Sequence, residues 1–246
     1  MSPNYHDLSQ SRALTRVSLR WLPEPPFENT ETLVLMVGEW YVDLRVDKQS
    51  GALDWAIAGQ CLLKDTDPRR IVFTHTIDSN GNFNVSNPCP FIPLLNGYDL
   101  ETGAMPRPDV PGKPVTEYEE VWRYLSKKEI GMGEMEKPIA WILESEEDVA
   151  SHYLQGGTTT FLARIEGRHL ALQQMRTDDR GKPGDSDWEE NITGGEVISI
   201  ASDFDCHVQY SWAFTGQKVT VKDRRYVVRA FDVADVLSKP TQLAKI

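Results

Sequence analysis

The sequence predicts an all-β protein built from two successive antiparallel β-barrels. Short segments with strand composition, joined by polar turns, fill both halves of the chain. Apolar and polar residues alternate cleanly in the clearest of these segments, as they do in half-buried antiparallel strands. At 246 residues the chain is long for one domain, but it suffices for two small domains that each bury a core.

The first firm strands are expected at residues 32–36 and 40–46, with Gly38 between them. Residues 1–16 are polar and aperiodic, which favours a flexible arm, and a strand can begin at residues 17–21. Because side chains alternate across a strand, the second firm strand has two distinct faces. One face carries Tyr41, Asp43 and Arg45, and the other carries Trp40, Val42, Leu44 and Val46.

Residues 53–63 and 70–77 read as a β-hairpin, because the turn-forming sequence KDTDP separates two strand-like segments. In the second segment His75 shares a face with Phe73 and Ile77, so one histidine points where apolar residues point. The same alternation places Asp78 on the opposite face. Both side chains can line one barrel interior only if a bulge or a strand end turns Asp78 inward.

Residues 80–114 are rich in Pro, Gly and Asn and show no periodicity, but their apolar content predicts a packed lid rather than disorder. Residues 115–124 fit either a strand or a short helix, and a strand is favoured. Residues 126–137, charged and glycine-bearing, look like a surface linker. The expected domains are therefore an N-terminal barrel at 17–125 and a C-terminal barrel at 138–237.

The second half contains further segments of strand composition, which are expected to build the second barrel. Two tight connections are expected between strands, at residues 166–169 and 221–225. Residues 177–191 form an acidic loop that contains Gly and Pro. The expected strands lie at residues 139–144, 158–165, 169–175, 196–201, 206–214 and 226–232.

Charge and cysteine content narrow the possible partners and the compartment. A formal net charge of −11 and a pI near 5.0 oppose binding to nucleic acid or to an anionic membrane surface. The three cysteines are widely spaced and form no CxxC, which suits reduced thiols. No signal-peptide core and no membrane-spanning stretch is found, so a cytoplasmic protein is expected.

The familiar catalytic motifs are missing from the sequence. The five histidines do not show the spacing of a zinc site, and neither a GxSxG elbow nor a glycine-rich phosphate loop is present. The sequence therefore predicts no metal, nucleotide or flavin cofactor. Acidic clusters such as residues 117–120 are more often solvated faces than paired catalytic carboxylates.

Several polar and aromatic side chains remain as candidates, each with two readings. His75 is either a core histidine held by hydrogen bonds or, inside a barrel, an acid or base near neutral pH. Tyr41, Arg45 and Arg229 face water in an open sheet, whereas in a closed barrel of about eight strands such groups orient one small ligand. Aromatic residues such as Trp55, Tyr210 and Trp212 either line the wall of a ligand cavity or pack in the hydrophobic core.

Four phrases occur in an order that resembles the fungal Hri-type proteins. They are DWAIAG at residues 54–59, TIDS at 76–79, LETGAM at 100–105 and YEEVW at 118–122. That family is named for association with a casein-kinase-I homologue and has two consecutive lipocalin-like (calycin-type) β-barrels. The resemblance is dense over residues 21–123 and thin afterwards. It implies the fold and a protein-interaction role, and it carries no catalytic motif.

Lipocalin-like barrels also serve fungal natural-product pathways, where cofactor-free proteins steer cyclisations, including hetero-Diels–Alder couplings. By this analogy of fold, the expected function is a cyclase that binds hydrophobic polyketide or terpenoid intermediates. The alternative is a non-enzymatic adaptor that binds a kinase, another protein or a second copy of the chain. The expected catalytic residues are Tyr41, Arg45, His75 and Asp78, and the expected substrate-binding residues are Trp55, Phe73, Glu101, Tyr210, Trp212 and Arg229.

Overall fold

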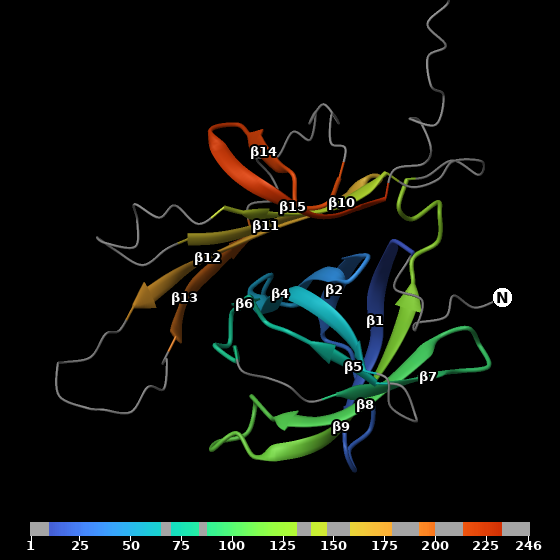
Figure 1. The fold of residues 1–246 in the computed structure, drawn as a ribbon. Helices are drawn as coiled ribbons and strands as arrows, with labels where there is room; N and C mark the ends of the chain where they lie inside the picture. Colours follow the sequence, from blue (N-terminus) through green and yellow to red (C-terminus); the bar gives the residue numbers. More distant parts are fainter. Residues whose placement is uncertain are drawn as a thin grey trace, which may run out of the picture.

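The computed structural model of the chain describes residues 10–64, 70–83, 88–131, 139–146, 158–178, 192–199 and 214–232. Within these residues the fold is all-β, as the sequence predicts, and it consists of two antiparallel sheets (Figure 1). No helix in this part of the chain is long and apolar enough to span a bilayer.

The first sheet closes into an antiparallel barrel of eight strands. The pairing runs from β1 through β2, β3, β4, β5, β7 and β8 to β9, and β9 pairs back with β1. A short additional strand, β6 (Ile77–Asp78), pairs with β4 beside β5. The barrel strands are β1 (Arg12–Trp21), β2 (Thr30–Val37), β3 (Trp40–Asp47), β4 (Leu53–Lys64), β5 (Arg70–Phe73), β7 (Cys89–Pro93), β8 (Asp99–Pro106) and β9 (Val115–Tyr124).

The structure confirms the strands predicted around residues 32–36, 40–46, 53–63 and 115–124. The prediction of a lid at residues 80–114 is wrong, because β7 and β8 in this range are two strands of the barrel wall. Proline and glycine residues interrupt the alternation of apolar and polar residues in these two strands, so the sequence pattern does not indicate them. In β8, Gly103 lies under the ring of Tyr118, where a Cβ atom would come within 2.7 Å of the phenol oxygen.

Two strand boundaries also differ from the prediction. β1 begins at Arg12, inside the expected arm, because the polar Arg12 and Arg16 are buried residues of the barrel. Residues 70–77 do not form one strand. β5 ends at Phe73, and the chain is irregular until β6 begins at Ile77.

The second sheet has six strands in the order β13-β12-β11-β10-β15-β14. Its predicted tight connections are confirmed, since Glu166 and Lys222 adopt the left-handed φ values of 50° and 54° in two short hairpins. Within the described residues this sheet is open, with β13 and β14 as its edges, so the expected second barrel is not observed. Its strands are β10 (Ala140–Ser145), β11 (Thr158–Ile165), β12 (Arg168–Asp178), β13 (Ile192–Ser199), β14 (Lys218–Val221) and β15 (Arg224–Asp232).

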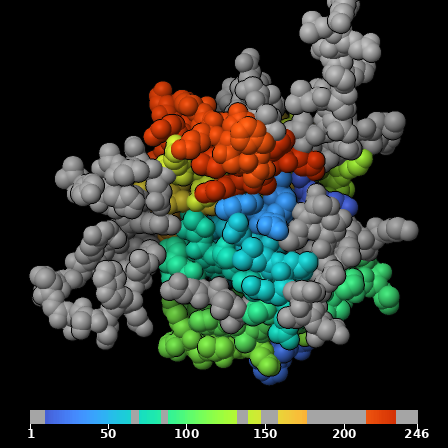
Figure 2. Space-filling view, in the orientation of Figure 1, coloured from blue at the N-terminus to red at the C-terminus, as the bar shows by residue number. Residues whose placement is uncertain are grey.

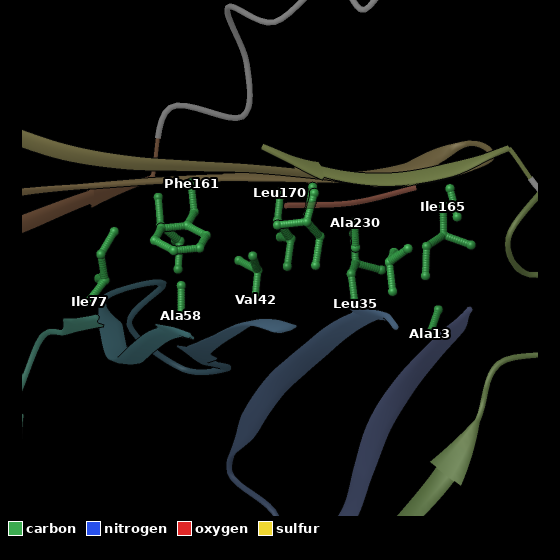
Figure 3. Packing of buried hydrophobic residues seen from close by; sticks show 14 of the residues in the cluster. Ala13, Leu35, Val42, Ala58, Ile77, Phe161, Ile165, Leu170 and Ala230 are labelled. Carbon is green, nitrogen blue, oxygen red and sulfur yellow. The ribbon is translucent and has the colours of Figure 1, made fainter. Parts of the chain in front are cut away.

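The second sheet packs on the outside of the barrel, over β1 to β4 and β6 (Figure 1). Outward-facing residues of the barrel, such as Leu35 and Val42, meet the fully buried Phe161 and Leu172 of the sheet. Figure 3 shows Leu35, Val42 and Phe161, with other members of this cluster, between the two layers. In the space-filling view residues 214–232, in red, lie directly on the blue part of the barrel (Figure 2). The two sheets therefore share one apolar core.

The connection between the sheets lies where a linker was expected. The first sheet ends at Tyr124 and the second begins at Ala140. Residues 132–138 of this connection lie outside the described residues. The expected loop at 177–191 begins as the end of β12, which continues to Asp178, and its remaining residues are outside the described ranges as well.

Candidate functional site

The barrel interior is unusually polar, because three alternate residues of β3 point into it. Val42 packs outward against the second sheet, so its neighbours Tyr41 and Asp43 point inward, as does Arg45. All three inward-pointing side chains are buried. From the sequence, Tyr41 and Arg45 could face either water or the interior of a closed barrel. In the structure both face the barrel interior.

Five charged residues form a largely buried network in the barrel interior. One oxygen of Glu120 accepts hydrogen bonds from Arg16 Nη1 at 2.6 Å and from Arg45 Nη1 at 3.0 Å. Arg45 also donates to Asp43 Oδ2 at 2.9 Å, and Arg16 to Glu28 Oε2 at 2.7 Å. Burial alone would raise the pKa of Glu120, but Arg45 and Arg16 hold this pKa below its usual value. The carboxylate is therefore a charged partner for both guanidinium groups.

Glu101 lies in the same interior and is held by aromatic donors. Tyr118 donates to Oε1 at 2.8 Å and Trp122 Nε1 donates to Oε2 at 3.0 Å. Burial, and after it the negative charge of Glu120, raises the pKa of Glu101 from 4.5 to about 7. Glu101 therefore takes up a proton near neutral pH, while Glu120 keeps its charge.

The raised pKa of Glu101 makes the stability of the protein depend on pH. Between pH 4.5 and about 7, the unfolded chain has lost this proton while the folded chain retains it, so stability falls as pH rises and then levels off. A Glu101→Gln variant should lack this loss. Urea unfolding should be measured at several pH values. As pH rises from 4.5 to about 7, the free energy of unfolding of E101Q should increase by about 3 kcal/mol relative to that of the wild type. Parallel pH profiles for the two proteins would contradict the assignment.

At the edge of the barrel, the irregular segment between β5 and β6 brings His75 beside Asp78. Gly59 allows this segment to cross β4 closely, because a Cβ atom there would lie 2.0 Å from the carbonyl oxygen of Thr74. The strand end after Phe73 thus removes the alternation that would separate the two side chains. His75 Nδ1 lies 2.6 Å from Asp78 Oδ2. In the part of the chain that the structure describes, His75 Nε2 has no hydrogen-bond partner.

Asp78 is fully buried, with 0 % exposure, and it organises this edge of the barrel. Its Oδ1 accepts hydrogen bonds from Trp55 Nε1 at 3.0 Å and from the Asn80 main chain at 2.7 Å. The Asp78 carboxylate accepts hydrogen bonds from two N–H groups, and it can only accept in its contact with His75 as well. The proton of a neutral His75 ring is therefore assigned to Nδ1, the atom that faces Oδ2. Asp78 thereby fixes the orientation of the imidazole ring and leaves its Nε2 atom available to a ligand.

The Trp55 ring packs beside the His75–Asp78 pair, and further aromatic rings pack against one another in the barrel interior. The Trp55 ring lies edge-on to the His75 ring, with centroids 6.3 Å apart, and Tyr41 lies edge-on to Phe73 at 5.2 Å. The guanidinium carbon of Arg45 lies 4.8 Å from the Trp55 ring centroid. Trp55 thus links the charged network of the barrel interior to the histidine at its edge.

The three polar donors expected from the sequence differ in how they are engaged. The Tyr41 hydroxyl donates to the Thr74 carbonyl at 3.0 Å, and Arg45 is committed to two carboxylates. Both groups therefore hold the barrel together. His75 is the one of the three whose second polar atom has no partner in the described residues.

The remaining expected residues are not gathered in this way. Arg229 lies on the second sheet, where it donates to Glu144 at 2.6 Å and packs over Trp40. Tyr210 and Trp212 lie outside the described residues. The described part of the chain contains no group of three or more His, Cys, Asp or Glu side chains arranged to hold a metal ion.

Four interior polar residues were missed by sequence reasoning, namely Arg16, Asp43, Glu120 and Gln174. Asp43 occupies the polar face of an alternating strand, a pattern that is equally typical of a surface strand, and only the closure of the barrel distinguishes the two. Glu120 belongs to the acidic cluster at residues 117–120, for which a solvated face is expected, but it is buried on the face of β9 that carries Tyr118 and Trp122. Arg16 lies in the segment expected to be a flexible arm. No sequence pattern around Gln174 indicates a role for it in a site.

These features define a closed eight-stranded antiparallel β-barrel, the strand number of the lipocalins, with a charged interior and a histidine–aspartate pair at its edge. The chain belongs to the HRI1 family, because the family model described as Protein HRI1 matches residues 12–225. This confirms the resemblance that the sequence phrases indicate.

A solved structure supports the fold. The chain is similar to the crystal structure of an uncharacterized protein, YLR301w, from Saccharomyces cerevisiae, with a TM-score of 0.56. The match covers 91% of this chain and 100% of that chain at 14% sequence identity. At this identity the likeness shows the fold alone. The comparison with curated proteins gave no match.

Proposed function

We propose that the barrel edge around His75 binds a hydrophobic small molecule that carries a carbonyl oxygen, and that it promotes a cofactor-free cyclisation. The observation that supports this function best is the 2.6 Å contact between His75 Nδ1 and the buried Asp78, with Nε2 left without a partner in the described residues. The neighbouring ring of Trp55 offers an apolar wall.

A hetero-Diels–Alder coupling is the reaction class in question. A quinone methide supplies the C=C–C=O unit and a terpene supplies an alkene. One C–C and one C–O bond form, three π bonds become one, and no electron or atom is lost. A protonated His75 donates its Nε2–H to the carbonyl oxygen as charge develops there, while Asp78 balances the charge of the ring. The proton stays on nitrogen throughout.

The orientation of the two reactants at the barrel edge contributes the rest of the expected rate acceleration. Holding two apolar partners in a reactive pose replaces their encounter in solution and contributes up to roughly 7–11 kcal/mol. No metal or redox group is required for this step. Tyr41 serves the same end indirectly, because its hydrogen bond to the Thr74 carbonyl fixes the segment that carries His75. Arg45 acts less directly, through its packing over Trp55, whose ring lies beside His75.

Binding of geranylacetone, a terpenoid ketone, tests the proposal. Titration followed by tryptophan fluorescence should show saturable binding of one molecule per chain. His75→Leu should weaken this binding by roughly 3–10-fold, the loss expected for one hydrogen bond. His169→Leu, on an exposed hairpin of the second sheet, is the matched control and should bind like the wild type. No saturable binding, or equal losses in both variants, would contradict the proposal.

A second candidate function is that of an interaction protein whose outer surface binds a kinase or another protein. The observation that favours it is the hairpin between β7 and β8, where Ile92 and Leu95 are exposed apolar side chains. The internally paired charges of the barrel serve stability alone in that case. Absence of geranylacetone binding would favour this second function.

A further inference from the structure

Gln174 joins the second sheet to the candidate site by two hydrogen bonds. Its Oε1 accepts from the main-chain N–H of Asp78 at 3.0 Å, and its Nε2 donates to the main-chain carbonyl of Asp78 at 2.8 Å. The side chain comes from β12 and is only 2 % exposed. One amide group therefore satisfies both main-chain polar groups of the residue whose carboxylate holds His75.

The strand that Gln174 contacts has, among the described residues, no neighbouring strand on the side away from β4. β6 has two residues, and it pairs with β4 only at Ile57 and Ala58. The primary amide of Gln174 replaces the missing strand neighbour, because it presents a donor and an acceptor as a peptide group does. The register of β12 with β13 shifts just after Gln174, as at a β-bulge, a feature that often re-aims side chains.

We infer that Gln174 is a positioning residue for His75, so that the second sheet completes the site at the barrel edge. This inference rests on the proposed function for its catalytic meaning, but its geometric part is independent of any substrate. Gln174 fixes the main chain of Asp78, Asp78 fixes Nδ1 of His75, and the orientation of Nε2 follows.

Gln173 provides a matched control on the same strand. It is the preceding residue, its side chain points to the other face, and it donates to Thr160 Oγ1 at 3.1 Å. Gln173→Leu and Gln174→Leu therefore remove the same chemical group from adjacent positions. Only the second change removes hydrogen bonds to Asp78.

The orientation of His75 is measured directly by nitrogen NMR of protein labelled at histidine, with the His75 signals assigned from a His75→Asn variant. In the wild type the neutral ring should show a single tautomer with the proton on Nδ1. In Q174L the two ring nitrogens should move towards averaged signals, whereas Q173L should retain the wild-type pattern. A Q174L protein that is folded and keeps the single tautomer would overturn the inference.

A second variant keeps the test decisive if Q174L does not fold. Gln174→Asn keeps a neutral amide, but its side chain is one methylene too short to reach both main-chain groups of Asp78. It should therefore fold and show a partial change of tautomer. An unchanged tautomer in folded Q174N would also overturn the inference.

Turnover separates the inference from the proposed function. If the barrel edge is catalytic, Q174L should lower kcat by roughly 10-fold and leave KM unchanged, because orientation rather than binding is lost. If the wild type has no cyclisation activity, the proposed function fails. The tautomer result for Q174L still decides the positioning role in that case.

Discussion

Replacing Glu120 with alanine is expected to lower the free energy of unfolding by about 3–5 kcal/mol, because it leaves two buried guanidinium groups without their shared carboxylate. The side chains of Glu120 and Arg16 are each 3 % exposed and that of Arg45 is 7 % exposed. Water therefore cannot replace the lost partner. Arg45 retains only Asp43, whose Oδ1 is buried without a partner among the described residues.

The adjacent Glu119 offers the control for this prediction. It pairs with Arg20 at 3.2 Å, with side-chain exposures of 31 % and 38 %. Such an exposed pair contributes about 0–1 kcal/mol, so Glu119→Ala should be close to the wild type. Urea unfolding followed by tryptophan fluorescence measures both variants. Losses within about 1 kcal/mol of each other would show that the buried network does not hold the barrel together.

The alternating strands of the barrel could be predicted from the sequence, but its closure could not. Tyr41, Asp43 and Arg45 alternate with apolar residues, and this pattern predicts β3 directly. The same pattern fits a surface strand, because closure depends on the long-range pairing of β9 with β1. β7 and β8 escaped prediction because Pro90, Pro93 and Gly103 interrupt their alternation.

The candidate site could be predicted in part. Simple alternation predicts His75 and Asp78 on opposite faces, and only a strand end or a bulge can bring them together. The structure has a strand end at Phe73, made possible by the close crossing at Gly59. Gln174 is 96 residues from Asp78 in the sequence, so no local pattern could connect the two.

The central claim, that His75 at the barrel edge assists a cofactor-free cyclisation, is tested most directly by single-turnover rates. The assay couples a quinone methide, generated in situ from a 2-hydroxybenzyl precursor, with a terpene alkene. Rates are measured against the uncatalysed background, and the product stereochemistry is recorded. His75→Ala and the exposed control His169→Ala are compared at a temperature at which thermal unfolding curves show both variants to be fully folded.

The wild type and H169A should accelerate the coupling and favour one stereoisomer, and H75A should be slower by on the order of 10²-fold, the effect of removing one donor to a developing oxyanion. Selectivity should fall less than the rate, because the Trp55 ring beside His75 remains in place. A rate and selectivity for H75A equal to those of the wild type, or a wild type no faster than the uncatalysed reaction, would contradict the claim.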